Sequence, residues 1–154
     1  MRYTKAQREI VRTLAVMHRR VLGVQYLLAE GRWFTPQTLP KGIHPAPLGL
    51  CFANAARLAT RRPALRYCEG YATIALSTDG ALFAAEHGWC IDEHDRVVDP
   101  TWCTANGSPG LAYLGIVITP DEWRDAKRRC ERSALWDYRN RFPLVRQRQE
   151  GATR

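Results

Sequence analysis

The chain has 154 residues, of which 45% are hydrophobic and 25% charged, and this fits one compact domain with its own core. The apolar fraction is near the globular average, which excludes a low-complexity chain, and five cysteines are too few for a disulfide-dense scaffold. Because five is an odd number, we do not expect a fully paired secreted framework either.

The net charge of +8 is concentrated at the two ends of the chain. Residues 1–20 carry six basic and one acidic side chain, residues 121–154 carry ten and six, and residues 21–120 carry seven and eight. We therefore expect chemistry in the near-neutral middle, which is rich in Cys, His, Trp and Gly, and a solubility or docking role for the ends. No apolar run approaches the ~18 residues of a membrane span and no signal-peptide pattern is present, so we expect a cytoplasmic protein with reduced thiols and no membrane partner.

The first half of the chain predicts helices separated by a loop. Between residues 3 and 28, apolar side chains recur every three or four positions, which indicates one or two amphipathic helices. Residues 35–49 contain four prolines and are predicted to form a loop. The Ala-rich residues 51–59 predict a helix that Pro63 ends.

The second half predicts four strands and a final helix. The expected strands are residues 66–76, 82–91, 96–99 and 111–118. Thr119 as N-cap and Pro120 at the first position predict the start of the last helix. These elements indicate a single α+β domain, made of an N-terminal helical region (1–30), a core (48–118), a C-terminal helix (119–142) and a frayed basic tail (143–154).

A hairpin in the middle of the chain is predicted to bring a histidine and an aspartate together. If its turn is centred near Glu93, residues whose numbers sum to 186 face each other, which pairs His87 with Asp99 and Trp89 with Val97. A register slip of one residue would put His87 and Asp99 on opposite faces. A carboxylate held against one imidazole nitrogen leaves the other nitrogen free to act as a base.

Cys51 is the candidate nucleophile on which this base would act. A thiol in the first turn of a helix lies near free amide protons and the positive end of the helix dipole, which favours the thiolate. The same amides could donate to an oxyanion. Cys51, His87 and Asp99 therefore predict a catalytic triad of nucleophile, base and orienting acid.

At these residues the chain resembles the transglutaminase-like branch of the papain-like cysteine enzymes. Residues 49–52 (GLCF) are similar to the family's Gly-x-Cys-aromatic helix start, and residues 69–71 (EGY) lie where members often have a Gly-Tyr strand. Residues 87–89 (HGW) and 97–102 (VVDPTW) resemble its His-x-Trp and Asp-x-Thr signature. The resemblance covers residues 48–118, and the block with the His and the Asp is its most specific part.

The resemblance implies a papain-like core, in which the helix that begins at Cys51 packs on an antiparallel sheet carrying His87 and Asp99, with extra helices at both ends. It implies thiol-dependent acyl transfer or hydrolysis of an amide or peptide through a thioester, without a cofactor, as in small prokaryotic or phage members. The substrate would be a protein, a peptide or a small-molecule amide, met in the host cytoplasm if the gene belongs to a phage. Leu50 stands where animal transglutaminases have Gln, so crosslinking of protein glutamines is not implied.

Further residues are candidates for the substrate or oxyanion site, each with a structural alternative. Asn54 lies one turn after Cys51 and would orient the site, donate to the oxyanion or bond a loop. Trp89 and Trp102 would be core or cleft-wall aromatics, and Trp89 would then cover the triad from water. Glu69, an acid in an apolar strand, would be paired or functional, and Tyr71 is a candidate for the cleft.

Two other classes of function remain open. A zinc site could use His87, Cys90, His94 and Cys103, although no Cys-x-x-Cys or His-x-x-x-His spacing is present. The second is a nucleic-acid or protein binding module on a catalytically vestigial scaffold, with the basic run 127–132 and the basic ends meeting nucleic acid or an acidic partner. The cysteines other than Cys51 are predicted to be small core residues; they are Cys68, Cys90, Cys103 and Cys130.

Overall fold

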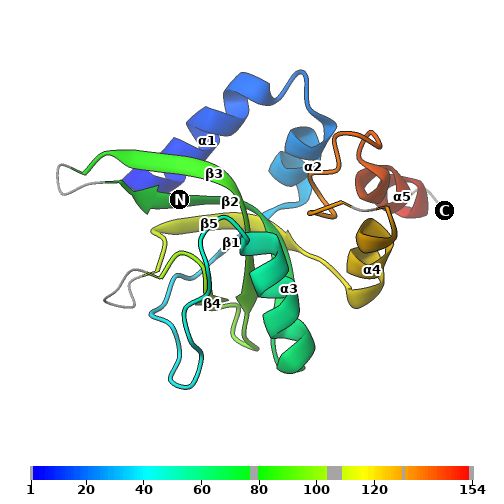
Figure 1. Ribbon diagram of the computed structural model, residues 1–154. Coiled ribbons are helices and arrows are strands. Elements are labelled where there is room, and N and C mark those ends of the chain that lie inside the picture. The colour runs from blue at the N-terminus through cyan, green and yellow to red at the C-terminus, as the bar shows by residue number, and fades with distance from the viewer. Residues whose placement is uncertain (1, 77–79, 104–108, 130, 153–154) are drawn as a thin grey trace.

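The computed structural model describes residues 2–76, 80–103, 109–129 and 131–152, and within them the chain has a mixed α+β fold (Figure 1). The helices are α1 (Lys5–Met17), α2 (Leu22–Glu30), α3 (Cys51–Arg61), α4 (Pro120–Arg128) and α5 (Pro143–Ala152). The strands are β1 (Arg32–Phe34), β2 (Arg66–Ala75), β3 (Leu82–Ile91), β4 (Val97–Val98) and β5 (Ala112–Val117). The predicted α+β class is confirmed.

The described strands form one antiparallel sheet that curls on itself. Their order is β1-β5-β2-β3-β4, so the first and fourth strands lie at the two edges. An isolated bridge between Thr35 and Arg96 joins these edges, and the Val97 amide donates to the Thr35 carbonyl at 2.8 Å. The curl gives the sheet an inner face and an outer face.

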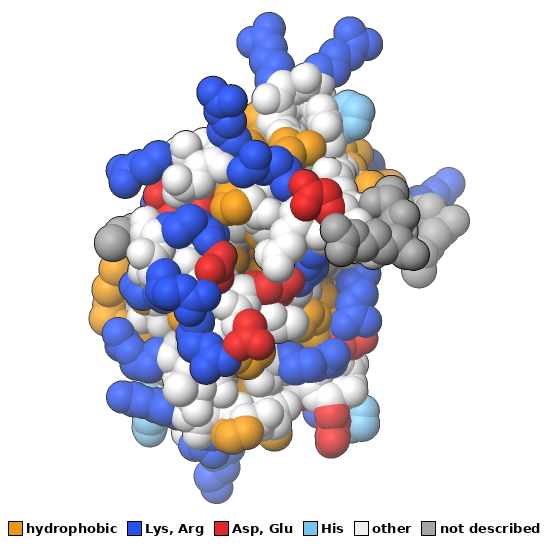
Figure 2. Space-filling view, turned by 90° about the vertical axis from the view of Figure 1, so that its right-hand side faces the viewer, with side chains coloured by type: hydrophobic (Ala, Val, Ile, Leu, Met, Phe, Trp, Pro, Cys, Tyr) orange, Lys and Arg blue, Asp and Glu red, His pale blue; other side chains and the backbone are white. Residues whose placement is uncertain are grey.

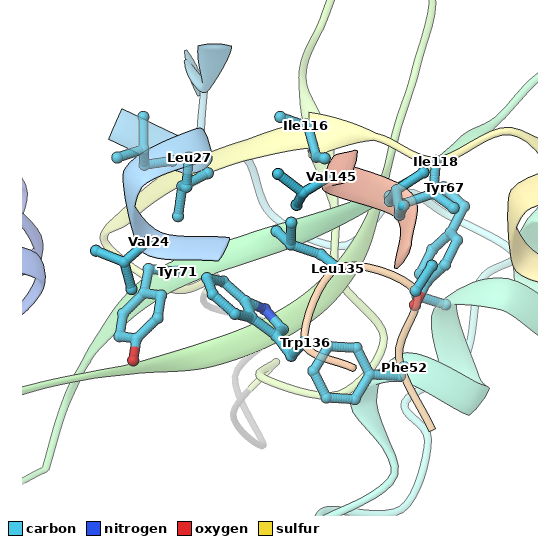
Figure 3. Packing of buried hydrophobic residues seen from close by; sticks show 14 of the residues in the cluster. Val24, Leu27, Phe52, Tyr67, Tyr71, Ile116, Ile118, Leu135, Trp136 and Val145 are labelled. Carbon is cyan, nitrogen blue, oxygen red and sulfur yellow. The ribbon is translucent and has the colours of Figure 1, made fainter. Parts of the chain in front are cut away.

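The two faces bury different side chains because residues alternate along each strand. On β2, Tyr67 and Tyr71 pack with the helices, whereas Cys68 and Ala72 point to the inner face. The outer cluster takes buried residues from all five helices of the described chain. Figure 3 shows part of it, with Val24 and Leu27 of α2, Phe52 of α3 and Val145 of α5. The inner cluster consists of Phe34, Cys68, Ala72, Trp89, Ile91, Val97 and Tyr113.

Most predicted elements have structural counterparts. The four predicted strands correspond to β2, β3, β4 and β5, and the helix predicted over 51–59 extends to Arg61. The short edge strand β1 lies directly before the Pro-rich loop and was not predicted. Two helices separated by residues 18–21 account for the N-terminal apolar periodicity.

The C-terminal part differs from the prediction. Thr119 caps the start of α4 as the sequence indicates, and Glu122 completes a capping box, but the helix ends at Arg128 instead of continuing to residue 142. Residues 143–152 are not a frayed tail: they form α5, whose Leu144 and Val145 are buried in the outer cluster. The many basic side chains of this segment led to the prediction of a tail, although Leu144 and Val145 attach it to the core.

Candidate active site

Cys51 is the first residue of α3 and is half-buried. The preceding Gly49 has a φ of 80°, a left-handed conformation that suits glycine and turns the chain into the helix. Leu50 occupies the N-cap and provides no side-chain hydrogen bond, so the N-cap residue does not cap the amides of the first turn. These amides are the donors that the sequence predicted for the region of the thiol.

The structure brings His87 and Asp99 together. Nε2 of His87 lies 2.8 Å from Oδ2 of Asp99, and both side chains are buried. The predicted register is nevertheless wrong, because Ile91 pairs with Val97 and the facing residue numbers sum to 188. A difference of two residues keeps each side chain on the same face, so the predicted contact forms along a diagonal of the hairpin.

Three further groups hold the Asp99 carboxylate in place. The Tyr113 hydroxyl donates to Oδ2 at 2.8 Å, and the backbone amides of Thr101 and Trp102 donate to Oδ1 at 2.9 and 3.1 Å. Burial alone would raise the pKa of Asp99, but the charge of His87 and these hydrogen bonds bring it below its ordinary value. Asp99 is therefore an ionised, fixed acceptor for the imidazole.

His87 also acts on the thiol of Cys51, whose pKa it lowers through hydrogen bonding and its charge. Because Nε2 bonds Asp99, Nδ1 is the ring nitrogen left for this contact. Helix α3 reaches β3 at Gly88, where an added Cβ would lie only 2.9 Å from the Cα of Phe52. A glycine is needed there because a larger residue would push the start of the helix away from the histidine.

The two titrating groups are shifted in opposite directions. Burial raises the pKa of Cys51, but the hydrogen bond and charge of His87 and the amides of Gly88 and Phe52 outweigh it, so the pKa lies below its ordinary value. Burial lowers the pKa of His87, but Asp99 and Cys51 raise it to about 9. Both shifts favour a thiolate beside an imidazolium at neutral pH.

Two tryptophans flank the imidazole. The ring of Trp102 stacks on His87 at 3.9 Å between centroids, and this tryptophan is only half-buried. Trp89 is fully buried in the inner cluster, with its ring centroid 6.3 Å from that of His87. Trp102 is thus the tryptophan that covers the His87 ring. Trp89, which was expected to cover the triad, is a core side chain instead.

Asn54 links two segments of the site through its side-chain amide. Its Nδ2 donates to the Pro47 carbonyl at 2.8 Å and to Oγ1 of Thr101 at 3.0 Å, which uses both amide hydrogens. The first bond holds the loop before Cys51, and the second holds the segment after Asp99. Three roles were considered for Asn54. The structure fits two of them, which are to orient the site and to bond a loop.

Glu69 lies outside the cleft. It is fully buried on the outer face, where its carboxylate accepts hydrogen bonds from the Tyr67 hydroxyl, the Ser133 hydroxyl and the amides of Ala134 and Leu135. Burial raises the pKa of Glu69, and these donors partly oppose the rise. Glu69 therefore anchors the segment after α4 to the sheet, and its assignment to a substrate or oxyanion site is corrected.

Tyr71 is also a core residue. It is 5% exposed and packs edge-to-face with Trp136, with ring centroids 5.5 Å apart. Its side chain points to the outer face, whereas His87 lies on the inner face. Its proposed place in the cleft is likewise corrected.

The residues missed by the sequence reasoning are long-range partners. Tyr113 comes from β5, two strands away from β3, and only the curl of the sheet brings it to Asp99. Thr101 belongs to the motif, but the sequence predicts no partner for it. The pattern Asp-x-Thr-Trp contained both amides that hold the carboxylate, and it was the one local signal available.

The other cysteines and the metal alternative can be placed for the described residues. Cys68 and Cys90 are buried, Cys103 is half-buried, and Cys130 lies outside the described residues. Among the residues that the structure describes, no group of three or more His, Cys, Asp or Glu side chains could hold a metal ion. The zinc alternative for His87, Cys90, His94 and Cys103 therefore has no support in their arrangement.

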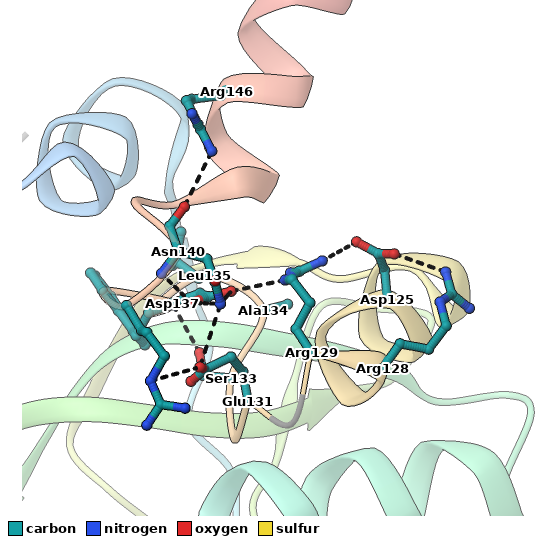
Figure 4. A network of polar contacts seen from close by, with 12 residues as sticks. Asp125, Arg128, Arg129, Glu131, Ser133, Ala134, Leu135, Asp137, Asn140 and Arg146 are labelled. Atoms are coloured by element: carbon teal, nitrogen blue, oxygen red, sulfur yellow. Dashed lines mark hydrogen bonds and ion pairs between the residues drawn. The ribbon is translucent and has the colours of Figure 1, made fainter.

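Much of the C-terminal positive charge is used within the protein. Arg129 pairs with both Asp125 and Asp137, and Arg148 pairs with Glu122 (Figure 4 shows the former). Figure 2 shows acidic side chains among the Lys and Arg side chains on the face that lies at the right of Figure 1. Ion pairing reduces the charge that this region can offer to an external phosphate or carboxylate.

Comparison of the chain with protein-family models, with curated proteins and with solved structures found no match. None of the helices in the described residues is long and apolar enough to cross a membrane.

Proposed function

We propose that the protein is a cysteine-dependent enzyme that transfers an acyl group or hydrolyses an amide through a thioester on Cys51. His87 acts as the acid and base and Asp99 orients it, within a papain-like, transglutaminase-like core. The observation that carries the proposal is the position of the His87 ring, with Nε2 2.8 Å from Oδ2 of Asp99 and the ring near enough to the Cys51 thiol to lower its pKa by hydrogen bonding and charge. A base needs this hydrogen-bond reach to the nucleophile, and an orienting group needs the other nitrogen.

The proposed reaction follows from the proton positions. The Cys51 thiolate attacks the carbonyl carbon, a C–S bond forms and the oxygen becomes an oxyanion beside the amides at the start of α3. The His87 imidazolium gives its proton to the leaving amine, and the C–N bond breaks to leave a thioester and neutral imidazole. Water or an acceptor amine then attacks, His87 takes its proton, and the thiolate leaves, which regenerates the ion pair.

The substrate class follows from this chemistry. An amide or peptide carbonyl on a protein, a peptide or a small molecule provides the electrophile. The two half-reactions require neither a redox agent nor a metal, because only a proton and an acyl group move. The alternative is a binding module for nucleic acid or protein on a vestigial scaffold, in which the thiol would have no turnover.

Acylation by an activated ester tests the proposal without knowledge of the natural substrate. We expect p-nitrophenyl acetate to release nitrophenolate and to leave an acetyl group on Cys51, detected by intact mass and peptide mapping. Cys51→Ala should abolish the adduct, His87→Ala should slow its formation strongly, and Cys103→Ala, which removes another half-buried thiol, should leave it unchanged. Wild-type acetylation no faster than that of His87→Ala would contradict the proposal and favour the binding module.

A further inference from the structure

A cavity of about 760 Å³ lies between the C-terminal half of α3 and the start of α4, apart from the candidate active site. Its walls come from Ala56 and Ala59 of α3, from the chain around Pro63, from Tyr67 and from the start of α4. Cavities of this size commonly hold small ligands. The thiol chemistry makes no use of this space.

The body of the cavity is apolar. Tyr67 and Trp123 meet edge-to-face with centroids 5.3 Å apart and form one wall. On the α3 side, the cavity is lined by the small side chains of Ala56 and Ala59. Larger side chains at these two positions would fill the space. The Tyr67 hydroxyl already bonds Glu69, so this wall offers a ligand its aromatic face.

The charged side chains that line the cavity within the described residues are both basic. Arg66 and Arg124 line it, and no Asp or Glu side chain of the described chain does. A third cation, Lys127 Nζ, lies 5.6 Å from the centre of the Trp123 ring. The acids that pair with the two arginines, Asp95 and Asp121, are not among the lining residues.

We propose that this cavity binds an aliphatic carboxylate of medium chain length, with the hydrocarbon chain between α3 and α4 and the carboxylate near Arg124. The apolar walls exclude a highly polar ligand, and the cationic lining favours an anion over a neutral chain of the same length. Arg124 is the better anchor because its own partner, Asp121, is exposed in a helical i,i+3 pair that contributes little. Arg66 is held by Asp95 and the Asp92 carbonyl.

The test is calorimetric titration of the whole protein with sodium dodecanoate below its micelle concentration, compared with dodecanol. We expect saturable binding of dodecanoate at one site per chain and weaker binding of dodecanol. Arg124→Gln should weaken dodecanoate binding about fivefold, the effect of one exposed charge pair. Arg128→Gln is the matched control, because Arg128 lies one turn further along α4 in the same kind of pair, with Asp125, and does not line the cavity.

A second variant tests whether the carboxylate binds in this cavity, because it fills the cavity with a larger side chain. Ala59→Trp should fill the cavity and weaken binding more than tenfold, and its urea unfolding midpoint would show that it folds. The proposal is overturned if dodecanoate does not bind saturably, if Ala59→Trp binds it as wild type does, or if the two arginine variants behave alike. Binding of an apolar peptide where dodecanoate fails would also overturn it, because the occupant would then be a protein segment.

Discussion

Nε2 of His87 and Oδ2 of Asp99 lie 2.8 Å apart, and both side chains are only 1% exposed. The same oxygen accepts the Tyr113 hydroxyl, and the second oxygen is saturated by two backbone amides. The imidazole therefore has one well-defined orientation. Its other nitrogen, Nδ1, does not bond Asp99 and is available to the Cys51 thiol.

Replacement of Asp99 should disable the histidine without removing it. In Asp99→Asn the amide can present a hydrogen to Nε2, which favours the tautomer with its proton on Nδ1, facing the thiol. We expect acetylation of Cys51 by p-nitrophenyl acetate to slow about 10²-fold or more, the scale of general acid–base assistance. Asp95→Asn is the control, because Asp95 is an exposed partner of Arg32 and Arg66. Equal rates in Asp99→Asn and wild type, with both folded, would remove Asp99 from the mechanism.

Asn54 should matter for both stability and reactivity. Asn54→Leu leaves the Pro47 carbonyl and the Thr101 hydroxyl without their donor, so we expect a loss of about 1–3 kcal/mol in the free energy of unfolding. Acetylation of Cys51 should also slow, and its pH dependence should move toward that of a free thiol, because the helix start would drift from His87.

The control for Asn54 lies on the same helix. Thr60→Val removes an exposed hydroxyl that bonds the Ala56 carbonyl, and we expect a change within about 0.5 kcal/mol and normal acetylation. Urea unfolding and stopped-flow acetylation measure the two effects. If Asn54→Leu is destabilised but its pH dependence is unchanged, Asn54 is a structural residue only.

Glu69 should be a stability residue with little direct effect on the thiol. In Glu69→Gln, an amide NH₂ replaces a carboxylate oxygen and faces hydroxyl or amide groups that are themselves donors. Some of these buried donors then lose their acceptor, so we expect a loss of about 2–3 kcal/mol in the free energy of unfolding. Glu86→Gln is the control, since Glu86 is partly exposed and bonds Tyr138 at the surface. An unfolding midpoint of Glu69→Gln equal to wild type would mean that the segment around Ser133 is not held by this carboxylate.

The fold was predictable to the extent that local patterns determine it. Strand alternation and the N-cap at Thr119 were visible in the sequence, and so was a helix beginning at Cys51. The hairpin register was not, because it depends on the turn. The Asp92 side chain accepts the amides of His94 and Arg96, and Asp95 adopts a φ of 59°, which centres the turn on His94 and not on Glu93.

The parts of the site that depend on residues close together in the sequence were predictable. Cys51, His87 and Asp99 have recognisable neighbours, and two of the three could be paired by counting along a hairpin. Tyr113 could not be assigned, because its contact with Asp99 depends on the curl of the whole sheet. Glu69 was misassigned for the same reason: all its partners except Tyr67 are 64–66 residues away and have no local signature.

The central claim is that His87 activates Cys51, and the pH dependence of Cys51 alkylation by iodoacetamide, mapped by peptide mass, tests it most directly. The thiolate persists as pH falls until its lowered pKa is reached, so we predict an inflection below the ordinary value of 9.0 and a second near 9, where His87 loses its proton. His87→Gln should replace both by a single inflection at or above the ordinary thiol value. A wild-type Cys51 that titrates only at or above that value, indistinguishable from His87→Gln, would contradict the account.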